Sequence, residues 1–116
     1  MTREFIRLSE FEKQCKKVGL CEDEVRDVEL ALLANPVIGD LMVGTGGIRK
    51  TRIPLPNRGK SGGARVIYID FASYQKTYLI TLYGKSDTEN LSQSEKNELR
   101  ALVNILKSEL IKRSEK

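Results

Sequence analysis

The stretch from Gly44 to Ile69 reads GTGGIRKTRIPLPNRGKSGGARVIYI, and we interpret the remaining residues as the scaffold that carries it. It holds six of the nine glycines, two of the three prolines and six Lys or Arg residues, but no acidic side chain. A dense positive patch raises the local concentration of phosphate ligands, so the stretch predicts a polyanionic partner. A solvated basic loop without a ligand is the alternative.

The first half of this stretch predicts a strand with one basic face. Residues Ile48 to Leu55 alternate so that Lys50 and Arg52 share a face. The other face takes the side chains of Thr51, Ile53 and Leu55. Pro54 and Pro56 cannot donate to a strand ladder, so the strand is expected to end there. Residues 57–63, NRGKSGG, are expected to form a loop.

Two further strands are predicted from the β-branched and aromatic residues that follow, at Arg65–Phe71 and Thr77–Tyr83. The short connection Ala72–Lys76 makes them an antiparallel hairpin. With that loop length, the expected register places Phe71 opposite Thr77 and Arg65 opposite Tyr83.

Helices are predicted on both sides of this region. Residues 3–8 suggest a short edge strand, after which Ser9 and Glu12 form an S-x-x-E capping box for a helix that stops at Gly19. A second helix is expected from about Glu22 to Ala34, with an acidic first turn. Its apolar stripe consists of Val25, Val28 and Leu32.

A third, long helix is predicted behind a second capping box, made by Ser92 and Glu95. Its apolar stripe consists of Leu99, Leu102, Val103, Leu106 and Leu110. The predicted order is therefore β-α-α-β-β-β-α in one domain over residues 1–116. We expect the α+β class, with an antiparallel sheet and helices packed on one face.

Composition excludes several classes of site. There is no histidine, and Cys15 and Cys21 form no Cys-x-x-Cys pair, so no metal or other cofactor is expected. Cys15 is predicted to be a core residue and Cys21 to precede the second helix. With no apolar leader and no long apolar run, a cytoplasmic protein with no membrane partner is expected.

Two nucleotide-binding motifs are present only in part and are excluded. Gly59-Lys60-Ser61 resembles the end of a P-loop, but Pro54 occupies the first glycine position and a strand follows. GTGGIR has Arg49 where the dinucleotide fingerprint requires its third glycine.

The chemistry open to the basic patch is RNA cleavage or simple phosphate binding. Without histidine, the proton acceptor for a 2′-hydroxyl would be Lys50, Lys85 or Tyr83, and crowding by arginines is expected to favour a neutral lysine or an ionised tyrosine. Arg52 and Arg65 can grip a phosphate bidentately and stabilise a pentacoordinate transition state. Composition alone does not separate the two possibilities.

The motifs GTGGIRKTR, RGKSGGAR, RVIYI and LYGK, in this order, resemble the RelE/ParE superfamily of bacterial toxins. The likeness covers nearly the whole chain and is nearest to the HigB-type branch. It implies a microbial-RNase-like sheet and metal-free cleavage of messenger RNA in the ribosomal A site, by attack of the 2′-hydroxyl on the neighbouring phosphate. It also implies a cognate antitoxin, in HigB-type pairs a HigA-type helix-turn-helix protein that represses the shared operon by binding operator DNA.

The resemblance also assigns residues. The catalytic basic pair falls on Lys50 and Arg52, the arginine opening the next strand on Arg65, and the residues around the last strand's end on Tyr83 and Lys85. RelE itself has a further arginine after its Gly-Lys and a tyrosine in its C-terminal segment, whereas in this chain Ser86 follows and the long helix has no tyrosine.

The proton acceptor would accordingly be Tyr83 or Lys85. Anchoring on ribosomal RNA would involve Arg49, Arg58 and Lys60. Two alternatives stay open: a ParE-like toxin that poisons gyrase without nuclease activity, and a non-catalytic RNA-binding module.

Overall fold

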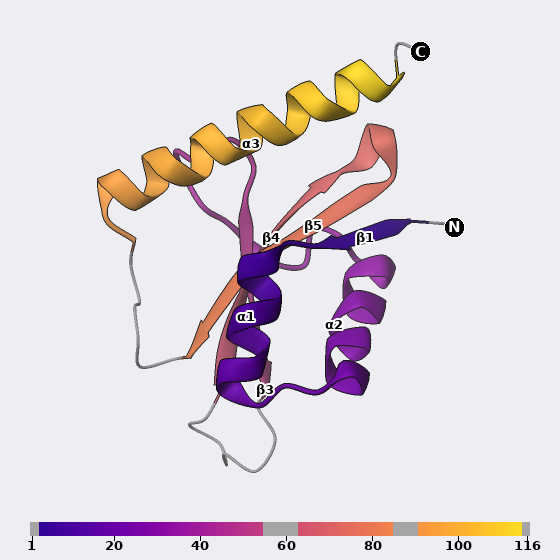
Figure 1. Cartoon of the computed structure of the whole chain (residues 1–116), viewed down its shortest axis with the longest axis vertical. Helices are drawn as coiled ribbons and strands as arrows, with labels where there is room; N and C mark the ends of the chain where they lie inside the picture. The colour runs from indigo at the N-terminus through magenta and orange to yellow at the C-terminus, as the bar shows by residue number, and fades with distance from the viewer. Residues whose placement is uncertain (1–2, 55–62, 85–90, 115–116) are drawn as a thin grey trace.

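The computed structural model describes residues 3–54, 63–84 and 91–114. In these ranges it is a five-stranded sheet, in the order β1-β5-β4-β3-β2, with three α-helices (Figure 1). The elements are β1 (Glu4–Arg7), α1 (Ser9–Val18), α2 (Glu22–Ala34), β2 (Asp40–Leu41), β3 (Arg49–Pro54), β4 (Gly63–Phe71), the 3₁₀ turn η1 (Ala72–Tyr74), β5 (Lys76–Gly84) and α3 (Gln93–Ser114). Leu55 and residues 57–62 of the predicted loop lie outside the described residues.

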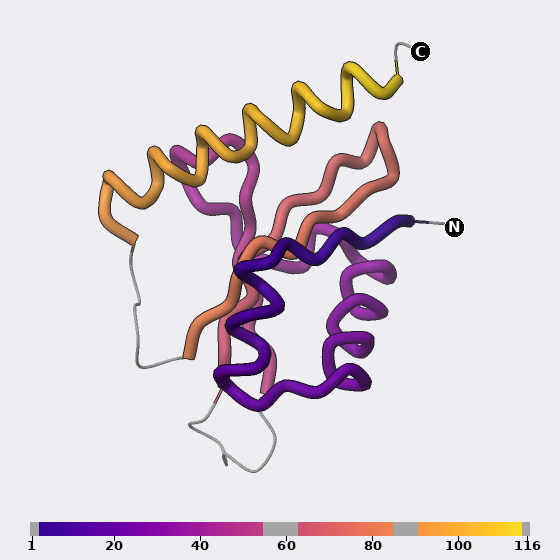
Figure 2. Tube along the Cα trace, viewed as in Figure 1, coloured from indigo at the N-terminus to yellow at the C-terminus, as the bar shows by residue number. Residues whose placement is uncertain are grey.

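The α+β class is confirmed, with three differences in arrangement. The two-residue strand β2 was not predicted, so the order has one strand more than expected. The edge strand β1 runs parallel to β5, so the sheet is mixed. The helices cover both faces: α1 and α2 pack on one, and α3 crosses the other (Figures 1 and 2). Strand β4 explains why, because its run from Val66 to Ile69 is buried without interruption, and a strand that is apolar on both faces needs cover on both.

The first helix begins one residue earlier than its capping box predicts. Leu8 is the N-cap and Ser9 is already helical, with no side-chain cap. The amide of Leu8 donates to the carbonyl of Leu79, and the carbonyl of Leu8 accepts from the Glu12 amide, so the chain passes from strand to helix without a gap. The predicted stop is confirmed, since Gly19 adopts a left-handed conformation with φ 77°.

The other two helices begin where predicted. Helix α2 spans the predicted residues behind Cys21, whose side chain forms a capping box with Glu24. At α3 the Ser92 amide donates to Glu95 Oε1 over 3.0 Å and the Glu95 amide donates to Ser92 Oγ over 3.1 Å, which confirms that capping box. Cys15 is buried against the sheet, and burial raises the pKa of its thiol to about 11, as suits a core residue. Within the described residues no helix combines the length and apolar character needed to cross a membrane.

A buried tyrosine at the centre of the sheet fixes the segment that leads into β2 and β3. Tyr68 is fully buried; its hydroxyl donates to the Pro36 carbonyl over 2.9 Å and accepts from the Gly39 amide over 3.0 Å. A Cβ on Gly39 would lie 2.8 Å from the Lys50 carbonyl oxygen, so only glycine fits there. The chain between α2 and β2 is thereby held directly against β3.

The GTGG segment is a packed turn between β2 and β3. Thr45 is fully buried, donates from Oγ1 to the Met42 carbonyl over 2.7 Å and accepts from the Ile48 amide over 3.2 Å. Gly46 and Gly47 have φ values of 84° and 120°, which L side chains rarely adopt. The segment therefore sets the start of β3 and does not form a phosphate-binding loop.

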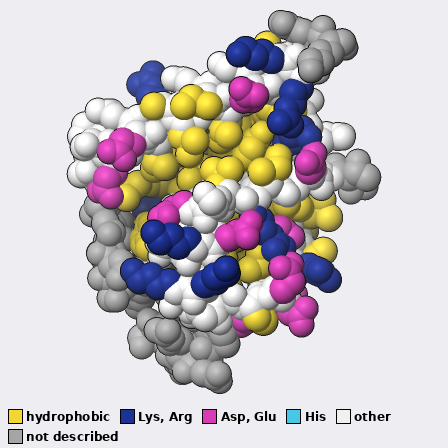
Figure 3. Space-filling model, viewed as in Figure 1, with side chains coloured by type: hydrophobic (Ala, Val, Ile, Leu, Met, Phe, Trp, Pro, Cys, Tyr) yellow, Lys and Arg dark blue, Asp and Glu magenta, His cyan; other side chains and the backbone are white. Residues whose placement is uncertain are grey.

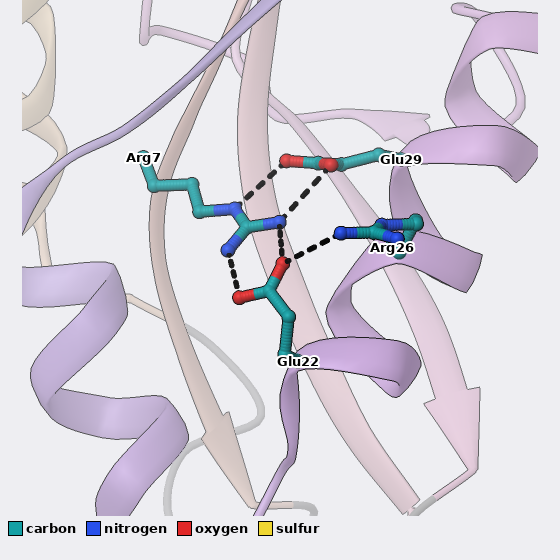
Figure 4. A network of polar contacts seen from close by, with 4 residues as sticks. All are labelled: Arg7, Glu22, Arg26 and Glu29. Carbon is teal, nitrogen blue, oxygen red and sulfur yellow. Dashed lines mark hydrogen bonds and ion pairs between the residues drawn. The ribbon is translucent and has the colours of Figure 1, made fainter.

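An ion-pair cluster holds α2 beside the edge strand (Figure 4). The Arg7 guanidinium donates to both oxygens of Glu22, each over 2.8 Å, and to both oxygens of Glu29, over 2.8 and 3.1 Å. Hydrogen bonds from Arg7 lower the pKa of Glu22, and the carboxylates raise the pKa of Arg7. Arg26 approaches Glu22 only to 3.8 Å.

Tyr68→Phe is expected to lower the free energy of unfolding by about 1–3 kcal/mol, because the Gly39 amide and the Pro36 carbonyl lose a buried partner. Chemical denaturation measures the loss. Tyr74→Phe is the matched control, since no hydrogen bond involves the Tyr74 hydroxyl within the described residues. Equal stability of the two variants would contradict the role assigned to Tyr68.

Arg7→Gln is expected to destabilise the fold at neutral pH, and the deficit should shrink in acid. A carboxyl whose folded-state pKa is lowered contributes stability that is present at neutral pH and lost as pH falls through that pKa. Thermal unfolding of wild type and variant across acidic pH measures this. Arg26→Gln removes an exposed ion pair with Glu22 and should have almost no effect on stability. A deficit that is independent of pH would speak against the Glu22 ion pair.

Candidate nucleic-acid interface

Three predicted residues line up across three neighbouring strands. Arg52 on β3 lies directly opposite Arg65 on β4, and Arg65 lies directly opposite Tyr83 on β5. Neighbouring strands are about 4.8 Å apart, so the three side chains leave the sheet in a compact row. Side chains two residues apart on a strand lie on the same face, so Arg65 shares a face with Ile67 and Ile69. Ile67 and Ile69 pack in the same apolar cluster as α3. The three side chains therefore lie on the face of the sheet that α3 covers further along the strands.

A β-bulge produces this alignment. At the hairpin end Phe71 pairs with Lys76 and not, as predicted, with Thr77. The register then shifts between Ile67 and Tyr68, which pair with Thr81 and Leu79 and so leave Ile80 as the extra residue on β5. The shift restores the pairing of Arg65 with Tyr83, which is confirmed.

Lys50 joins the same face one step along the strand. It pairs with Ile67, which in turn pairs with Thr81, so Lys50 lies next to the row of Arg52, Arg65 and Tyr83. Ile53, from the opposite set, is buried against α1 and α2, which confirms the predicted alternation of β3. We call Lys50, Arg52, Arg65 and Tyr83 the basic row.

The cations of the basic row have no carboxylate partners within the described residues. The salt bridges found there involve Arg3, Arg7, Arg26 and Lys76 and none of the three cations of the row. Arg52 is exposed, and Lys50 and Arg65 are half-buried. Since like charges directly opposite one another repel, the arrangement is costly to the fold and favourable to an anion placed between them.

The protonation of Tyr83 differs from the prediction, in which nearby arginines favour the ionised phenol. Burial raises the pKa of Tyr83, Arg65 lowers it less, and Glu95 adds to the rise. The phenol therefore keeps its proton at neutral pH. In this environment Tyr83 is suited to donate a hydrogen bond or a proton and poorly suited to accept one.

The other predicted residues lie elsewhere. Arg49 is on the opposite face of β3, where its Nη1 donates to the Gly39 carbonyl over 2.8 Å. Lys85, Arg58 and Lys60 fall outside the described residues, so their roles stay predictions, as does RNA binding by Arg49.

A groove that the sequence did not predict adjoins the basic row. It has a volume of about 620 Å³ and begins at Thr81 and Tyr83 on β5. Its other lining residues are Glu10, Gln14 and Lys17 of α1, Ile67 and Leu82 of the sheet, and Leu91, Glu95, Glu98, Leu99 and Leu102 in or just before α3. We call it the α1–α3 groove. No local sequence pattern predicts this groove, because its lining comes from α1, the sheet and α3.

The residue types of the basic row suit the binding of a phosphodiester. In the described residues no three His, Cys, Asp or Glu side chains gather to hold a metal ion. Two guanidinium groups on adjacent strands offer planar donors to phosphate oxygens, and the lysine adds a mobile charge.

One comparison with known protein families bears on this site. A family model described as the RelE toxin of the RelE / RelB toxin-antitoxin system matches residues 5–113. The match spans every strand and helix that forms or supports the basic row except the first residue of β1 and the last residue of α3.

Arg52→Gln is expected to stabilise the free protein by about 0.2–1 kcal/mol at low ionic strength, because it removes one of two like charges that face each other. Unfolding at low and high salt measures the gain, which should fade as salt screens the pair. Arg100→Gln, exposed on α3, is the control. A loss of stability that does not depend on salt would show that Arg52 is not under repulsion.

Proposed function

Because the chain belongs to the RelE toxin family and is therefore the toxin of a toxin–antitoxin system, we propose that it is an endoribonuclease that cuts messenger RNA in the A site of translating ribosomes. RelE-family toxins are in general translation inhibitors that cleave messenger RNA. The observation that carries the proposal for this chain is the basic row, in which two arginines and a lysine occupy neighbouring positions on one face of the sheet, with no salt bridge among the described residues.

The proposed reaction needs no metal. The 2′-oxygen attacks the adjacent phosphorus and the bond from phosphorus to the 5′-oxygen breaks, which leaves a 2′,3′-cyclic phosphate and a free 5′-hydroxyl. Arg52 and Arg65 hold the phosphate oxygens and stabilise the additional negative charge of the transition state. Lys50 or Lys85 accepts the 2′-hydroxyl proton, and Tyr83, which retains its proton, donates to the departing oxygen.

The ribosome is proposed to position the substrate. The row offers electrostatic stabilisation and lacks an imidazole, whose pKa lies near neutral pH, so orientation of the RNA by the A site would supply much of the rate. Arg58 and Lys60 are proposed to anchor on ribosomal RNA together with Arg49, which would use the nitrogens that the Gly39 carbonyl leaves free.

The finer family assignment is also a proposal. The motif order supports the HigB-type branch, with a HigA-type helix-turn-helix antitoxin that links the toxin indirectly to operator DNA. The toxin would act in the cytoplasm, where the ribosomes are.

A ParE-like toxin that poisons gyrase is the second candidate. Gyrase binding gives no reason to align Arg52, Arg65 and Lys50 on one face, whereas phosphate chemistry does. Incorporation of labelled amino acids and of labelled thymidine after induction separates the two. A prompt fall in DNA synthesis with translation intact would favour the gyrase hypothesis. A non-catalytic RNA-binding module would instead show steep salt dependence of binding without any cleavage.

Arg52→Ala and Arg65→Ala are each expected to reduce cleavage by roughly 10²–10³-fold, because each removes a positioned charge from the transition state. Primer extension on a reporter messenger, with and without drug-stalled ribosomes, measures cleavage, and growth of a strain without antitoxin reports arrest. Arg100→Ala controls for loss of an exposed arginine, and circular dichroism controls for folding. Full growth arrest by Arg65→Ala would refute its catalytic role.

A further inference from the structure

Three acidic residues lie on the described strands, and two of them already have a cation partner. Asp70 on β4 forms an ion pair with Arg3 over 3.1 Å, and Glu4 on β1 forms an ion pair with Lys76. Opposite charges are also mixed over α1 and α2, where Lys and Arg side chains lie close to Asp and Glu side chains (Figure 3). Asp40 on β2 is exposed, and its side chain takes part in no hydrogen bond or salt bridge within residues 3–54, 63–84 and 91–114. Asp40 is therefore the strand carboxylate that is available to a ligand.

The strand register places Asp40 beside the basic row. Asp40 pairs directly with Lys50 across β2 and β3, so the two side chains leave the sheet on the same face. Met42, two residues further along, packs in the same apolar cluster as α3, which agrees with this assignment of the face. Arg52 is the diagonal neighbour of Asp40, at about 7–8 Å between the backbones. The carboxylate thus lies at the β2 end of the basic row.

The backbone is fixed on both sides of Asp40. The Gly39 amide donates to the Tyr68 hydroxyl over 3.0 Å, and the Gly39 carbonyl accepts from Arg49 Nη1 over 2.8 Å. On the other side, the Met42 amide donates to the Ile48 carbonyl over 2.8 Å. A reacting group has to be held by a rigid support, and this pattern of hydrogen bonds supplies one for the carboxylate.

A carboxylate at this place meets a chemical requirement that a lysine meets poorly. In water a carboxylic acid loses its proton at about pH 4 and a lysine side chain at about pH 10. At neutral pH a carboxylate can therefore accept the proton of a 2′-hydroxyl directly. An ammonium group must first lose a proton before it can accept one.

The order of the strands would separate this proton acceptor from the proton donor. From β2 to β5 the face carries Asp40, Arg52, Arg65 and Tyr83 in turn. In an in-line displacement the attacking and leaving oxygens lie on opposite sides of the phosphorus. Asp40 and Tyr83 are three strand spacings apart, roughly 14 Å between backbones, so a phosphate held by the arginines has one of them on each side.

We propose that Asp40 is a further catalytic residue, which accepts the 2′-hydroxyl proton in place of Lys50 or Lys85. The proposal rests on the proposed ribonuclease function. The proton passes to a carboxylate oxygen of Asp40 while the 2′-oxygen bonds to phosphorus. The bond from phosphorus to the 5′-oxygen breaks, and that oxygen takes the proton of Tyr83. Proton exchange with water then restores both side chains, so the reaction consumes no other reactant.

The test measures single-turnover cleavage on drug-stalled ribosomes from about pH 6 to about pH 8.5, for wild type, Asp40→Asn and Asp40→Glu. With a carboxylate acceptor the wild-type rate should not change with pH, whereas a lysine acceptor would make it rise about tenfold per pH unit. Asp40→Asn keeps the shape of the side chain but cannot accept the proton, so it should lose roughly 10²–10⁴-fold in rate. Its residual rate should rise with pH, because hydroxide replaces the missing base. Asp40→Glu should recover part of the loss.

Asp27→Asn is the matched control. Asp27 is exposed on α2, and its side chain has no hydrogen bond or ion pair in the described part of the chain, so this variant should cleave as wild type does. Thermal unfolding checks that the Asp40 variants fold.

Three results would overturn the role of Asp40 and leave the nuclease intact. They are a wild-type rate for Asp40→Asn, a wild-type rate that rises tenfold per pH unit, and a large loss in Asp40→Asn whose residual rate does not depend on pH. The last of these would show that Asp40 only positions its neighbours. If wild type cuts no messenger at all, the proposed function itself fails, which is a distinguishable result.

Discussion

The pairing of Arg52 with Arg65 on adjacent strands is the constraint around which the structure is organised. The two guanidinium groups extend from directly paired positions on adjacent strands, with no carboxylate between them in the described residues. A fold that keeps like charges together must obtain its stability elsewhere. In this protein the stability comes from two apolar layers, one on each side of the sheet, and from polar contacts placed away from the row. The scaffold thereby maintains a positively charged surface that favours the binding of an anion.

Each supporting contact acts on the position of one strand of the row. The Tyr68 hydroxyl holds the chain that leads into β2 and β3, and the buried Thr45 turn starts β3 at the correct residue. The bulge at Ile80 shifts the register of β5 by one residue, so that Tyr83 pairs with Arg65. A one-residue slip on either side would move a member of the row to the other face of the sheet. The chemistry therefore depends on register more than on which residue types are present.

Local patterns predicted much of this. The alternation of β3 correctly placed Lys50 and Arg52 on one face, and the bounds of α2 and the Ser92 capping box were also correct, because caps and periodicity are local properties. The bulge could not be predicted, since Ile80 looks like any other apolar strand residue. The register at Arg65 was correct only because that bulge compensates for a shorter hairpin connection.

Features that require distant segments to meet were missed. The position of α3 on the second face follows from the uninterrupted apolar run of β4, which calls for cover on both sides of the sheet. Burial raises the pKa of Tyr83 more than Arg65 lowers it. The sequence alone predicts neither the burial of this ring nor its distance from these charges. The α1–α3 groove forms between two helices from opposite ends of the chain. Sequence therefore identified the candidate cations but not the groove beside them.

A double-mutant cycle on cleavage tests most directly whether the basic row acts as one unit on one phosphate. Cleavage rates on stalled ribosomes would be compared for wild type, Arg52→Ala, Arg65→Ala and the double variant. If both arginines grip the same phosphodiester, the double variant should lose far less than the product of the two single losses. Losses that multiply fully would mean that the two arginines act at independent places, which would contradict a single phosphate held between them.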